Sequence, residues 1–279
     1  MLEISNLSKS FKKKEVLKNI SINIEDGVYG LLGANGAGKT TLIRCIVNLY
    51  NTAKGSLRYQ GVDTSKNSEF SKKIGYLPQK FGLFKELIVY DNLQYFAVLK
   101  KIPKESIDKC IKESLKIVNL EDRISDKVST LSGGMIRRLG IAQAILGDPK
   151  IIIFDEPTVG LDPEERIRFK NLLSYIKENK IIIFSTHIIE DIEASCDQII
   201  VMNEGEILQV GSNEEIASVA KEKVFEVKQG TKIDSSWHIG KTFLKNGEVF
   251  LRILSNKNEG YKSVDPTIED GYMCIVKGI

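Results

Sequence analysis

Apolar residues recur largely at alternate positions in two stretches near the N-terminus, LEISNLSKSF at 2–11 and SINIE at 21–25. This period is that of a β-strand with one buried face, because successive side chains of a strand point to opposite sides. The same alternation is found in GSLRYQGVD at 55–63, and the short apolar run in KKIGYLPQ at 72–79 ends at Pro78. We therefore predict short strands in all four segments.

Two wholly apolar runs lie farther along the chain, in KIIIFDEP at 150–157 and KIIIFSTH at 180–187. Continuous apolar strands are typical of parallel sheets that are covered on both faces. The segment between them, PEERIRFKNLLSYIKEN at 163–179, predicts a crossover helix, and GVYGLLGANGAGKTTLIRCIV at 27–47 predicts a strand, a loop and a helix. Strands that alternate with helices predict an α/β core with a parallel sheet.

Helical spacing dominates residues 85–146, which we predict to form a helical insert in this core. In PKESIDKCIKESLKIVNL at 103–120, the residues Ile107, Ile111, Leu115 and Val118 recur at steps of three or four. One face of this segment is therefore expected to pack against the rest of the protein.

The C-terminal part of the chain has weaker patterns. DQIIVMNEGEILQVG at 197–211 predicts a β-hairpin, and Ser212 and Glu215 have the spacing of a helix capping box. Three further segments are interpreted as short strands: KVFEVKQG at 223–230, GEVFLRIL at 247–254 and YMCIVKGI at 272–279. We predict a domain at 1–215, with an antiparallel β subdomain beside the parallel core, and a small strand-containing accessory region at 216–279.

Composition and charge narrow the class of protein. The 279 residues include 40 basic and 37 acidic ones, which give a formal net charge of +3. This near balance argues against a nucleic-acid partner, because nucleic-acid-binding proteins usually concentrate basic residues on one face. The basic runs KSFKKK at 9–14 and VLKKIPK at 98–104 are interpreted as solvated surface.

The cysteines and the apolar runs indicate in which cellular compartment the protein is expected. The four cysteines have no paired spacing, so neither a disulfide framework nor a cysteine metal site is supported, and a reducing cytoplasm fits best. The first residues lack the pattern of a signal peptide, and the longest apolar runs are too short to cross a bilayer. We expect a protein that does not itself span the membrane.

The segment GANGAGKT at 33–40 fits the phosphate-binding motif G-x-x-x-x-G-K-[ST] at every fixed position and lies between a predicted strand and a predicted helix. Glycines let successive backbone N–H groups approach phosphate oxygens, and the helix N-terminus adds favourable partial charge. Lys39 is expected to reach the β and γ phosphates and Thr40 to bind Mg²⁺. The predicted nucleotide-binding residues of this loop are Gly33, Ala34, Asn35, Gly36, Ala37, Gly38, Lys39, Thr40 and Thr41.

Polar residues follow the two apolar strands. We expect Asp155 to hold Mg²⁺, usually through water, and Glu156 to point to where an attacking water lies. His187 follows the second run and can touch the γ-phosphate, but on spacing alone its role stays open, because a lone histidine at a strand end is more often structural.

LSGGMIRRLG at 131–140 raises a question, because a polar residue and two glycines again precede helical spacing. Free N–H groups at a helix start form an anion site, yet the chain already has one. The motifs GANGAGKT, YLPQ, LSGGM, IIIFDEPTVGLD and STH occur in the order seen in ATP-binding cassette proteins, the motor subunits of ABC transporters, and the chain resembles this family over about residues 1–215. The resemblance implies a P-loop NTPase fold.

This resemblance also accounts for the second anion site. In the family, two cassettes pair head to tail, and each signature motif closes over the ATP that the other holds. Ser132, Gly133 and Gly134 are thereby expected to face a partner's γ-phosphate, and Asp162 to lie in the loop that contacts the partner. Since the chain has one cassette, the resemblance implies a dimer with a second cassette, most simply a homodimer.

Further roles follow from the resemblance alone. Phe11 matches the aromatic residue that stacks on adenine, with Val16 nearby, although a core aromatic at a strand end is the alternative. Gln79 matches the residue that senses Mg²⁺ and the attacking water, Glu156 the general base and His187 the switch histidine. The sequence departs from the family at position 135, where methionine replaces the usual glutamine, and at position 11, where phenylalanine replaces the more frequent tyrosine.

The stretches LSGGMIRRLGIAQAILGDPK, PTVGLDPEERIRF and DPTIEDGYMCIV resemble cassettes of bacterial type-two exporters, the group of bacitracin- and lantibiotic-resistance pumps. This likeness implies an ATPase that drives a separate integral membrane permease from the inner face of the cell membrane. Two alternatives stay open: a soluble cassette ATPase without a membrane partner, and the ATPase subunit of an importer.

Overall fold

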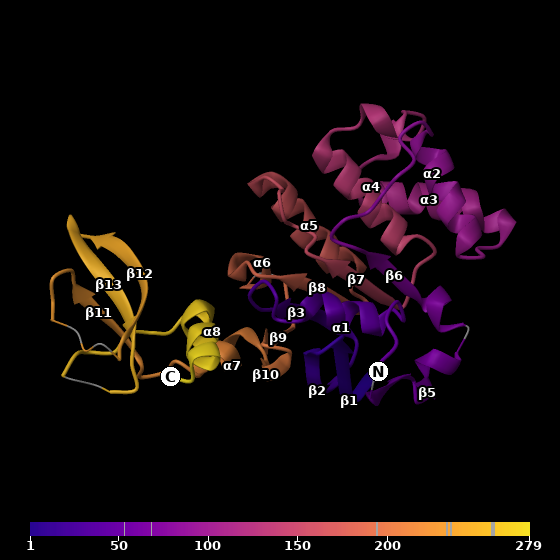
Figure 1. The fold of residues 1–279 in the computed structure, drawn as a ribbon. Helices are drawn as coiled ribbons and strands as arrows, with labels where there is room; N and C mark the ends of the chain where they lie inside the picture. Colours follow the sequence, from indigo (N-terminus) through magenta and orange to yellow (C-terminus); the bar gives the residue numbers. More distant parts are fainter. Residues whose placement is uncertain (53, 68, 194, 233, 235, 258–259) are drawn as a thin grey trace.

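The structure is a computed structural model that describes residues 1–52, 54–67, 69–193, 195–232, 234, 236–257 and 260–279. It contains a large mixed α/β body and, beyond it, a small three-stranded sheet (Figure 1).

A six-stranded sheet forms the centre of the large body. Its strands, in spatial order, are β10 (Glu206–Gly211), β9 (Gln198–Asn203), β3 (Gly27–Leu32), β8 (Ile181–Thr186), β7 (Ile151–Asp155) and β6 (Ile74–Leu77). All neighbouring pairs are parallel except β9 and β10, which form the predicted antiparallel hairpin. The parallel core predicted from the two apolar runs is thus confirmed, and the carboxyl ends of its strands meet at one edge.

Both faces of this sheet are covered, which explains why β7 and β8 are apolar throughout. Ile152 and Phe154 pack in a core that includes residues of α2, α3, α4 and α5, whereas Ile151 and Ile153 pack on the opposite face with residues of α1 and the N-terminal strands. The helices on these two faces are α1 (Lys39–Ile46), α2 (Val89–Leu99), α3 (Lys104–Ile117), α4 (Gly133–Ile145) and the crossover helix α5 (Pro163–Ile176).

A second, antiparallel sheet packs against α1. Its order is β2 (Lys14–Ile24), β1 (Leu2–Phe11), β4 (Lys54–Tyr59) and β5 (Val62–Asp63). The predicted half-burial is visible in β1, where Leu2, Ile4 and Leu7 are buried and point into the core. Two 3₁₀ turns, η1 (Thr64–Lys66) and η2 (Phe70–Lys73), connect this sheet to β6.

The helices α2, α3 and α4 and two 3₁₀ turns, η3 (Glu121–Arg123) and η4 (Val128–Thr130), occupy the segment predicted to be helical. The four apolar residues that the pattern placed on one helix face, at 107, 111, 115 and 118, are all buried. The interpretation of VLKKIPK as solvated surface is wrong for Lys100. Its ammonium donates to the carbonyls of Gln143, Ala144 and Leu146 and so caps the end of α4, and burial lowers its pKa to about 8.

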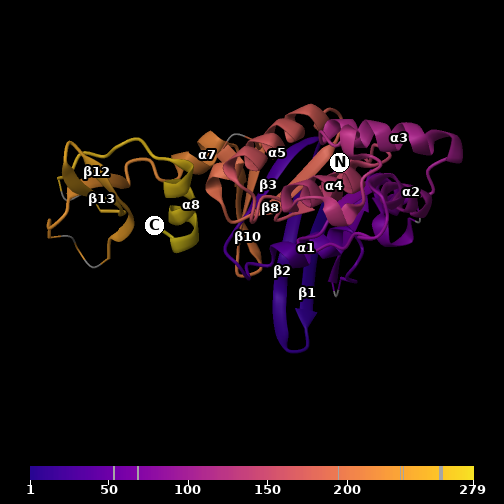
Figure 2. The ribbon, with the colours of Figure 1, turned by 90° about the horizontal axis from the view of Figure 1, so that it is seen from above.

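The C-terminal part contains α6 (Ile189–Glu193), α7 (Asn213–Ser218) and an antiparallel sheet of order β11 (Val224–Lys228), β13 (Glu248–Leu254) and β12 (His238–Lys245). The Ser212–Glu215 capping box forms as predicted. The helix α8 (Ile268–Lys277) lies, with α7, between this sheet and the large body (Figure 2).

The prediction of a strand at 272–279 is wrong, because these residues belong mostly to α8. The side chains of Thr267 and Asp270 form a second capping box, which starts a helix with Ile268, Tyr272, Ile275 and Val276 facing the large body. A Cβ at position 271 would meet the backbone oxygen of residue 216 at 1.9 Å, so glycine there permits the close contact of α8 with α7. The strand β12 was not predicted.

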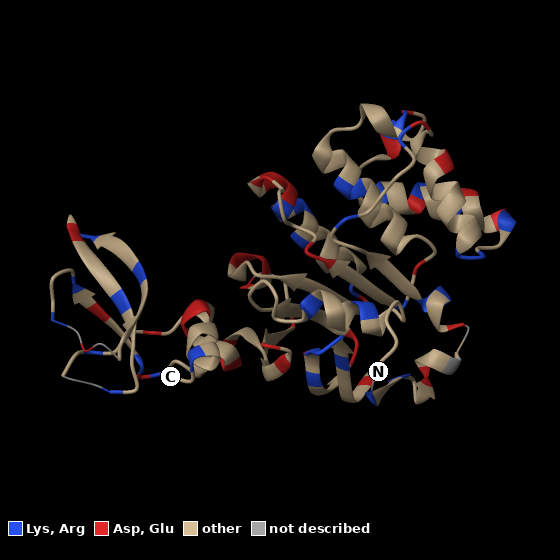
Figure 3. Cartoon of the chain, viewed as in Figure 1, with Lys and Arg blue, Asp and Glu red and all other residues tan. Residues whose placement is uncertain are grey.

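Charged residues of both signs are interspersed over the elements of the protein (Figure 3). Within the described part of the chain, no helix is both long and apolar enough to cross a membrane.

Candidate functional site

The loop between β3 and α1 lies at the carboxyl edge of the central sheet. Its first glycine is required for packing, because a Cβ at Gly33 would lie 2.4 Å from the backbone oxygen of Met202. Its last glycine, Gly38, precedes α1 with a φ of 106°, a left-handed conformation that favours glycine. The loop therefore leads directly into the start of α1, where free backbone N–H groups form an anion site.

Lys39 is buried although it carries a charge. Its Nζ donates to the carbonyl oxygens of Gly33, at 2.7 Å, and of Ala34, at 3.1 Å. Burial lowers its pKa, although the carboxylates of Glu156 and Asp155 act in the opposite direction. The ammonium is thus held against the loop whose amides are predicted to bind phosphate.

Asp155 is the residue that best fits a cation. Its Oδ1 accepts hydrogen bonds from Thr40 Oγ1, at 3.1 Å, and from Ser185 Oγ, at 2.6 Å. Its Oδ2 is buried and has no hydrogen-bond partner in the described structure. A buried, unpartnered carboxylate oxygen beside a threonine hydroxyl suits Mg²⁺, which takes one or two protein oxygens and completes its shell with phosphate and water. Among the described residues, no group of three or more His, Cys, Asp or Glu that could hold a metal ion is found.

Glu156 follows β7, and both its backbone and its carboxylate have partners. Its backbone N–H donates to Ser185 Oγ at 2.9 Å, and its φ of 49° is unusual for a residue with a Cβ. Gln79 Nε2 donates to its Oε2 at 2.8 Å, and His187 Nδ1 lies 3.6 Å from its Oε1. The structure therefore brings together Gln79, Glu156 and His187, the three residues predicted to be catalytic.

A cavity of about 440 Å³ lies over the loop. It is lined by Lys14, Val16, Asn35, Gly36, Gly38, Lys39, Thr40, Thr41, Gln79 and Glu156. Most of the predicted loop residues and Val16 thus share one cavity, whereas Lys14 was not predicted.

Phe11 lies at the end of β1 and is 40% exposed, so it is not a core aromatic residue. Its ring packs edge-on against Tyr50, with 5.2 Å between centroids, and the ammonium of Lys9 lies 5.2 Å from its centre. It is not among the residues that line the cavity, and its contact with adenine stays a prediction.

The signature residues lie on a different element, at the start of α4. Ser132 caps this helix by accepting a hydrogen bond from the backbone N–H of Met135, and Ser132 and Gly133 are exposed. Asp162 caps α5 in the same way through the N–H of Glu165. In the described structure, residues 132–134 do not line the cavity over their own phosphate-binding loop.

Ser185 and Arg137 contact the site but were not assigned a role from the sequence. Ser185 was predictable, because β7 and β8 share the run KIIIF and pair in parallel register, which sets Ser185 opposite Asp155. Arg137 donates to the backbone of Gln79, Glu156 and Pro157 from α4, a contact that no local sequence pattern reveals.

The C-terminal helix also approaches the phosphate-binding loop. Burial raises the pKa of Tyr272 on α8, and a hydrogen bond with the backbone of Ala34 acts in the opposite direction. The hydroxyl of Tyr272 thus links α8 to the loop.

Comparison with known proteins identifies the family. The family described as ABC transporter matches residues 17–159. The chain is 39% identical over 215 residues to the uncharacterized ABC transporter ATP-binding protein YhcH of Bacillus subtilis (strain 168), which covers 75% of this chain and 69% of that protein. It is 34% identical over 221 residues to the linearmycin resistance ATP-binding protein LnrL of the same organism, covering 78% and 71%.

Solved structures agree. CbiO1 from Clostridium perfringens, part of the ABC transporter complex cbiONQ, has a TM-score of 0.70 and 29% identity over 77% of this chain and 89% of its own. The ATP-binding cassette MJ0796, seen as a dimer in a post-hydrolysis state bound to ADP and Pi, has a TM-score of 0.69 and 28% identity over 76% and 98%. The chain therefore belongs to the ABC transporter family, as an ATP-binding cassette that hydrolyses ATP.

Proposed function

We propose that this cassette hydrolyses Mg-ATP with Glu156 as general base and drives a separate membrane permease of an exporter. The observation that carries the chemical part is the Glu156 carboxylate. It is buried, it accepts a hydrogen bond from Gln79, and it lies close to His187 at the edge of the phosphate-binding cavity.

Each residue has a separate task in this proposal. The loop amides and Lys39 bind the β and γ phosphates and offset their charge. Thr40, Asp155 and Gln79 are the residues that would hold Mg²⁺, which neutralises charge on the transferred phosphoryl group when it is bound. Glu156 accepts the proton of the attacking water, and Gln79 and His187 orient its carboxylate.

A partner cassette completes the site. Ser132, Gly133 and Gly134 offer a hydroxyl and backbone N–H groups at an exposed helix start, away from their own cavity. Together with Asp162, they are proposed to meet the ATP and the loops of a second copy of this chain. The dimer seen for the related cassette MJ0796 supports this arrangement.

Export is proposed because residues 131–150 and 157–169 resemble cassettes of bacterial type-two exporters. The relatives include both the linearmycin resistance protein LnrL of Bacillus subtilis and the spermidine/putrescine import protein PotA of Haemophilus ducreyi, each 34% identical to this chain. We propose that it acts at the inner face of the cell membrane, bound to a permease.

Glu156→Gln tests the chemical proposal, because the amide occupies the same space but does not accept a proton. Phosphate release is expected to fall about 100- to 10,000-fold, while ATP binding persists. Glu178→Gln, at an exposed position after α5, is the matched control and is expected to turn over normally. Near-normal hydrolysis by Glu156→Gln would remove Glu156 from this role.

Purification of the tagged chain from membranes tests the proposal that it drives a membrane permease. A multi-span membrane protein is expected to co-purify, and vesicles with both proteins should expel substrate on addition of ATP. A cassette found only in the soluble fraction would favour an ATPase without a membrane partner, and uptake in the same assay would favour an importer.

A further inference from the structure

Arg137 connects three backbone segments around the site. Its Nε donates to the carbonyl of Pro157 at 2.8 Å, one terminal nitrogen donates to the carbonyl of Gln79 at 3.2 Å, and the other donates to the carbonyl of Glu156. The residue itself lies on α4, the helix that Ser132 caps. The Arg137 side chain thus joins the helix of the signature loop to Gln79 and Glu156, whose side chains are hydrogen-bonded to each other.

The guanidinium of Arg137 also packs against an aromatic ring. Its centre lies 5.6 Å from the centroid of the Phe81 ring, and burial lowers its pKa against the opposing effect of Asp155 and Glu156. A guanidinium presents several N–H groups in a fixed plane, so it can serve three carbonyls at once. A lysine ammonium also has three N–H donors, but they spread from one nitrogen and do not reproduce the planar spacing of the guanidinium.

The bond to Glu156 has a further consequence. The φ of 49° at this residue is a left-handed conformation, which a residue other than glycine keeps only where the surrounding structure fixes it. Ser185 holds the N–H on one side of Glu156, and Arg137 holds the carbonyl on the other. The two contacts together fix the backbone that aims the carboxylate.

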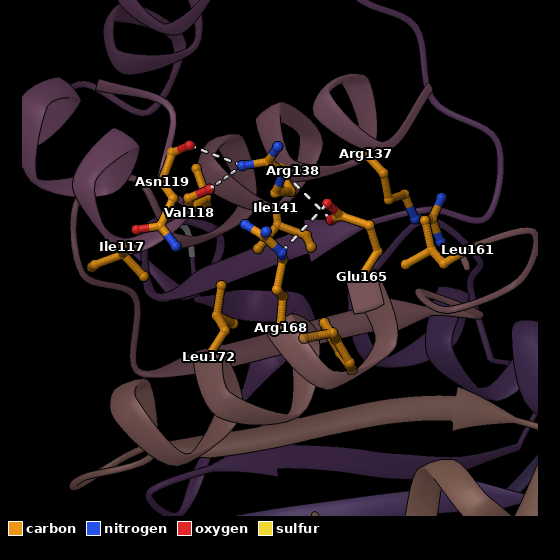
Figure 4. Close-up of a pocket in the computed structure, with 11 residues that line it drawn as sticks. Ile117, Val118, Asn119, Arg137, Arg138, Ile141, Leu161, Glu165, Arg168 and Leu172 are labelled. Atoms are coloured by element: carbon orange, nitrogen blue, oxygen red, sulfur yellow. Dashed lines mark hydrogen bonds and ion pairs between the residues drawn. The ribbon is translucent and has the colours of Figure 1, made fainter. Parts of the chain in front are cut away.

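The neighbouring residue strengthens the attachment of α4. Arg138 donates to the carbonyls of Val118 and Asn119 and lies 3.4 Å from the carboxylate of Glu165, which Arg168 also approaches (Figure 4). The backbone N–H of Glu165 also donates to the side chain of Asp162, which caps α5. Arg137 and Arg138 therefore both attach α4, the helix of the signature loop, to the elements around it.

We propose that Arg137 is a positioning residue, which keeps the Glu156 carboxylate aimed for catalysis and couples it to the position of the chain's own signature loop. This inference rests on the proposed role of Glu156. It adds that engagement of the signature loop with a partner's nucleotide acts on the catalytic carboxylate of the same chain, through Arg137 and the backbone.

Steady-state hydrolysis and ATP binding by Arg137→Met, in the full-length chain, test the proposal. The kcat is expected to fall about 10- to 100-fold, because small displacements of a catalytic group carry costs of this order, while the Kd of a fluorescent ATP analogue changes less than about twofold. Arg137→Lys should fold, bind ATP normally and recover only part of the kcat. Arg58→Met, at an exposed position on β4, is the control and should keep the wild-type kcat.

The double variant Arg137→Met/Glu156→Gln separates a positioning role from a general structural one. If Arg137 acts through Glu156, adding Arg137→Met to the Glu156→Gln protein should leave its residual rate unchanged. A wild-type kcat in Arg137→Lys, or the same fold-loss in both backgrounds, would overturn the proposal. A fully active Glu156→Gln would instead overturn the proposed function, so the two failures are distinguishable.

Discussion

Ser185 and Asp155 lie opposite each other in the parallel pair β7 and β8, and the serine hydroxyl donates to the carboxylate at 2.6 Å. The same hydroxyl accepts the backbone N–H of Glu156. One buried side chain on β8 therefore orients both the predicted magnesium ligand and the predicted general base.

Ser185→Ala should consequently weaken Mg²⁺ binding and destabilise the protein. Loss of a partner behind a metal ligand typically lowers affinity about 10- to 100-fold, and an unsatisfied buried N–H costs about 1–3 kcal/mol. Titration of the ATPase with Mg²⁺ and chemical denaturation measure the two effects. Ser174→Ala on the exposed side of α5 is the control, and an unchanged Mg²⁺ dependence in Ser185→Ala would contradict this role.

Phe11→Ala should weaken ATP binding by about 1–3 kcal/mol if the exposed ring stacks on the base. The measurement is the Kd of ATP by calorimetry with the folded variant. Tyr175→Ala removes an aromatic ring that is 73% exposed on α5 and should leave the Kd unchanged. If Phe11→Ala and wild type bind ATP with the same Kd, the ring does not stack on adenine and serves only its contact with Tyr50.

The accessory region should lose stability in acid through Asp270. Burial raises the pKa of this carboxyl, but hydrogen bonds from Arg252 and Thr267 outweigh it and leave the pKa below its ordinary value. A carboxyl whose folded pKa is lowered stabilises the protein above its unfolded pKa of about 3.9, and this contribution is lost as the pH falls further.

Asp270→Asn tests this dependence. Since Arg252 and Asp270 form a buried pair, the variant should be about 3–5 kcal/mol less stable at neutral pH. The gap to wild type should narrow below about pH 4, measured by denaturation of the full chain. A gap that stays constant down to pH 2 would assign the effect to the capping box rather than to charge.

The sequence predicted the elements whose patterns depend on local rules. The parallel strands were predicted because they are apolar on both faces, and the phosphate-binding loop because glycine spacing reflects backbone geometry. The strand assigned to YMCIVKGI failed because a short apolar run fits either period, and the Thr267–Asp270 capping box that decides for a helix lies upstream of it.

The contacts that the sequence did not reveal are made between distant segments. Lys100 caps a helix that ends at residue 145, and Arg137 reaches carbonyls at 79, 156 and 157. Both side chains are basic residues that composition alone assigns to the surface. Only the packing of α4 in the fold brings them to the backbone carbonyl groups that they bind.

The central claim is that the loop at Ser132 completes a partner's site and not its own. Glu156→Gln should form dimers that depend on ATP, and addition of Ser132→Arg should abolish them, because a bulky side chain fills the loop that faces the γ-phosphate. Size-exclusion chromatography with light scattering follows the dimers, and mixing Lys39→Ala with Ser132→Arg subunits should assemble one intact composite site.

The most direct measurement is the affinity of the isolated Ser132→Arg monomer for ATP, determined by equilibrium binding at concentrations where the wild type is monomeric. The two-chain account predicts a Kd close to that of wild type, since residues 132–134 do not line the cavity over their own phosphate-binding loop in the described structure. Loss of ATP binding by a folded Ser132→Arg monomer would show that the loop serves its own site and would contradict the account.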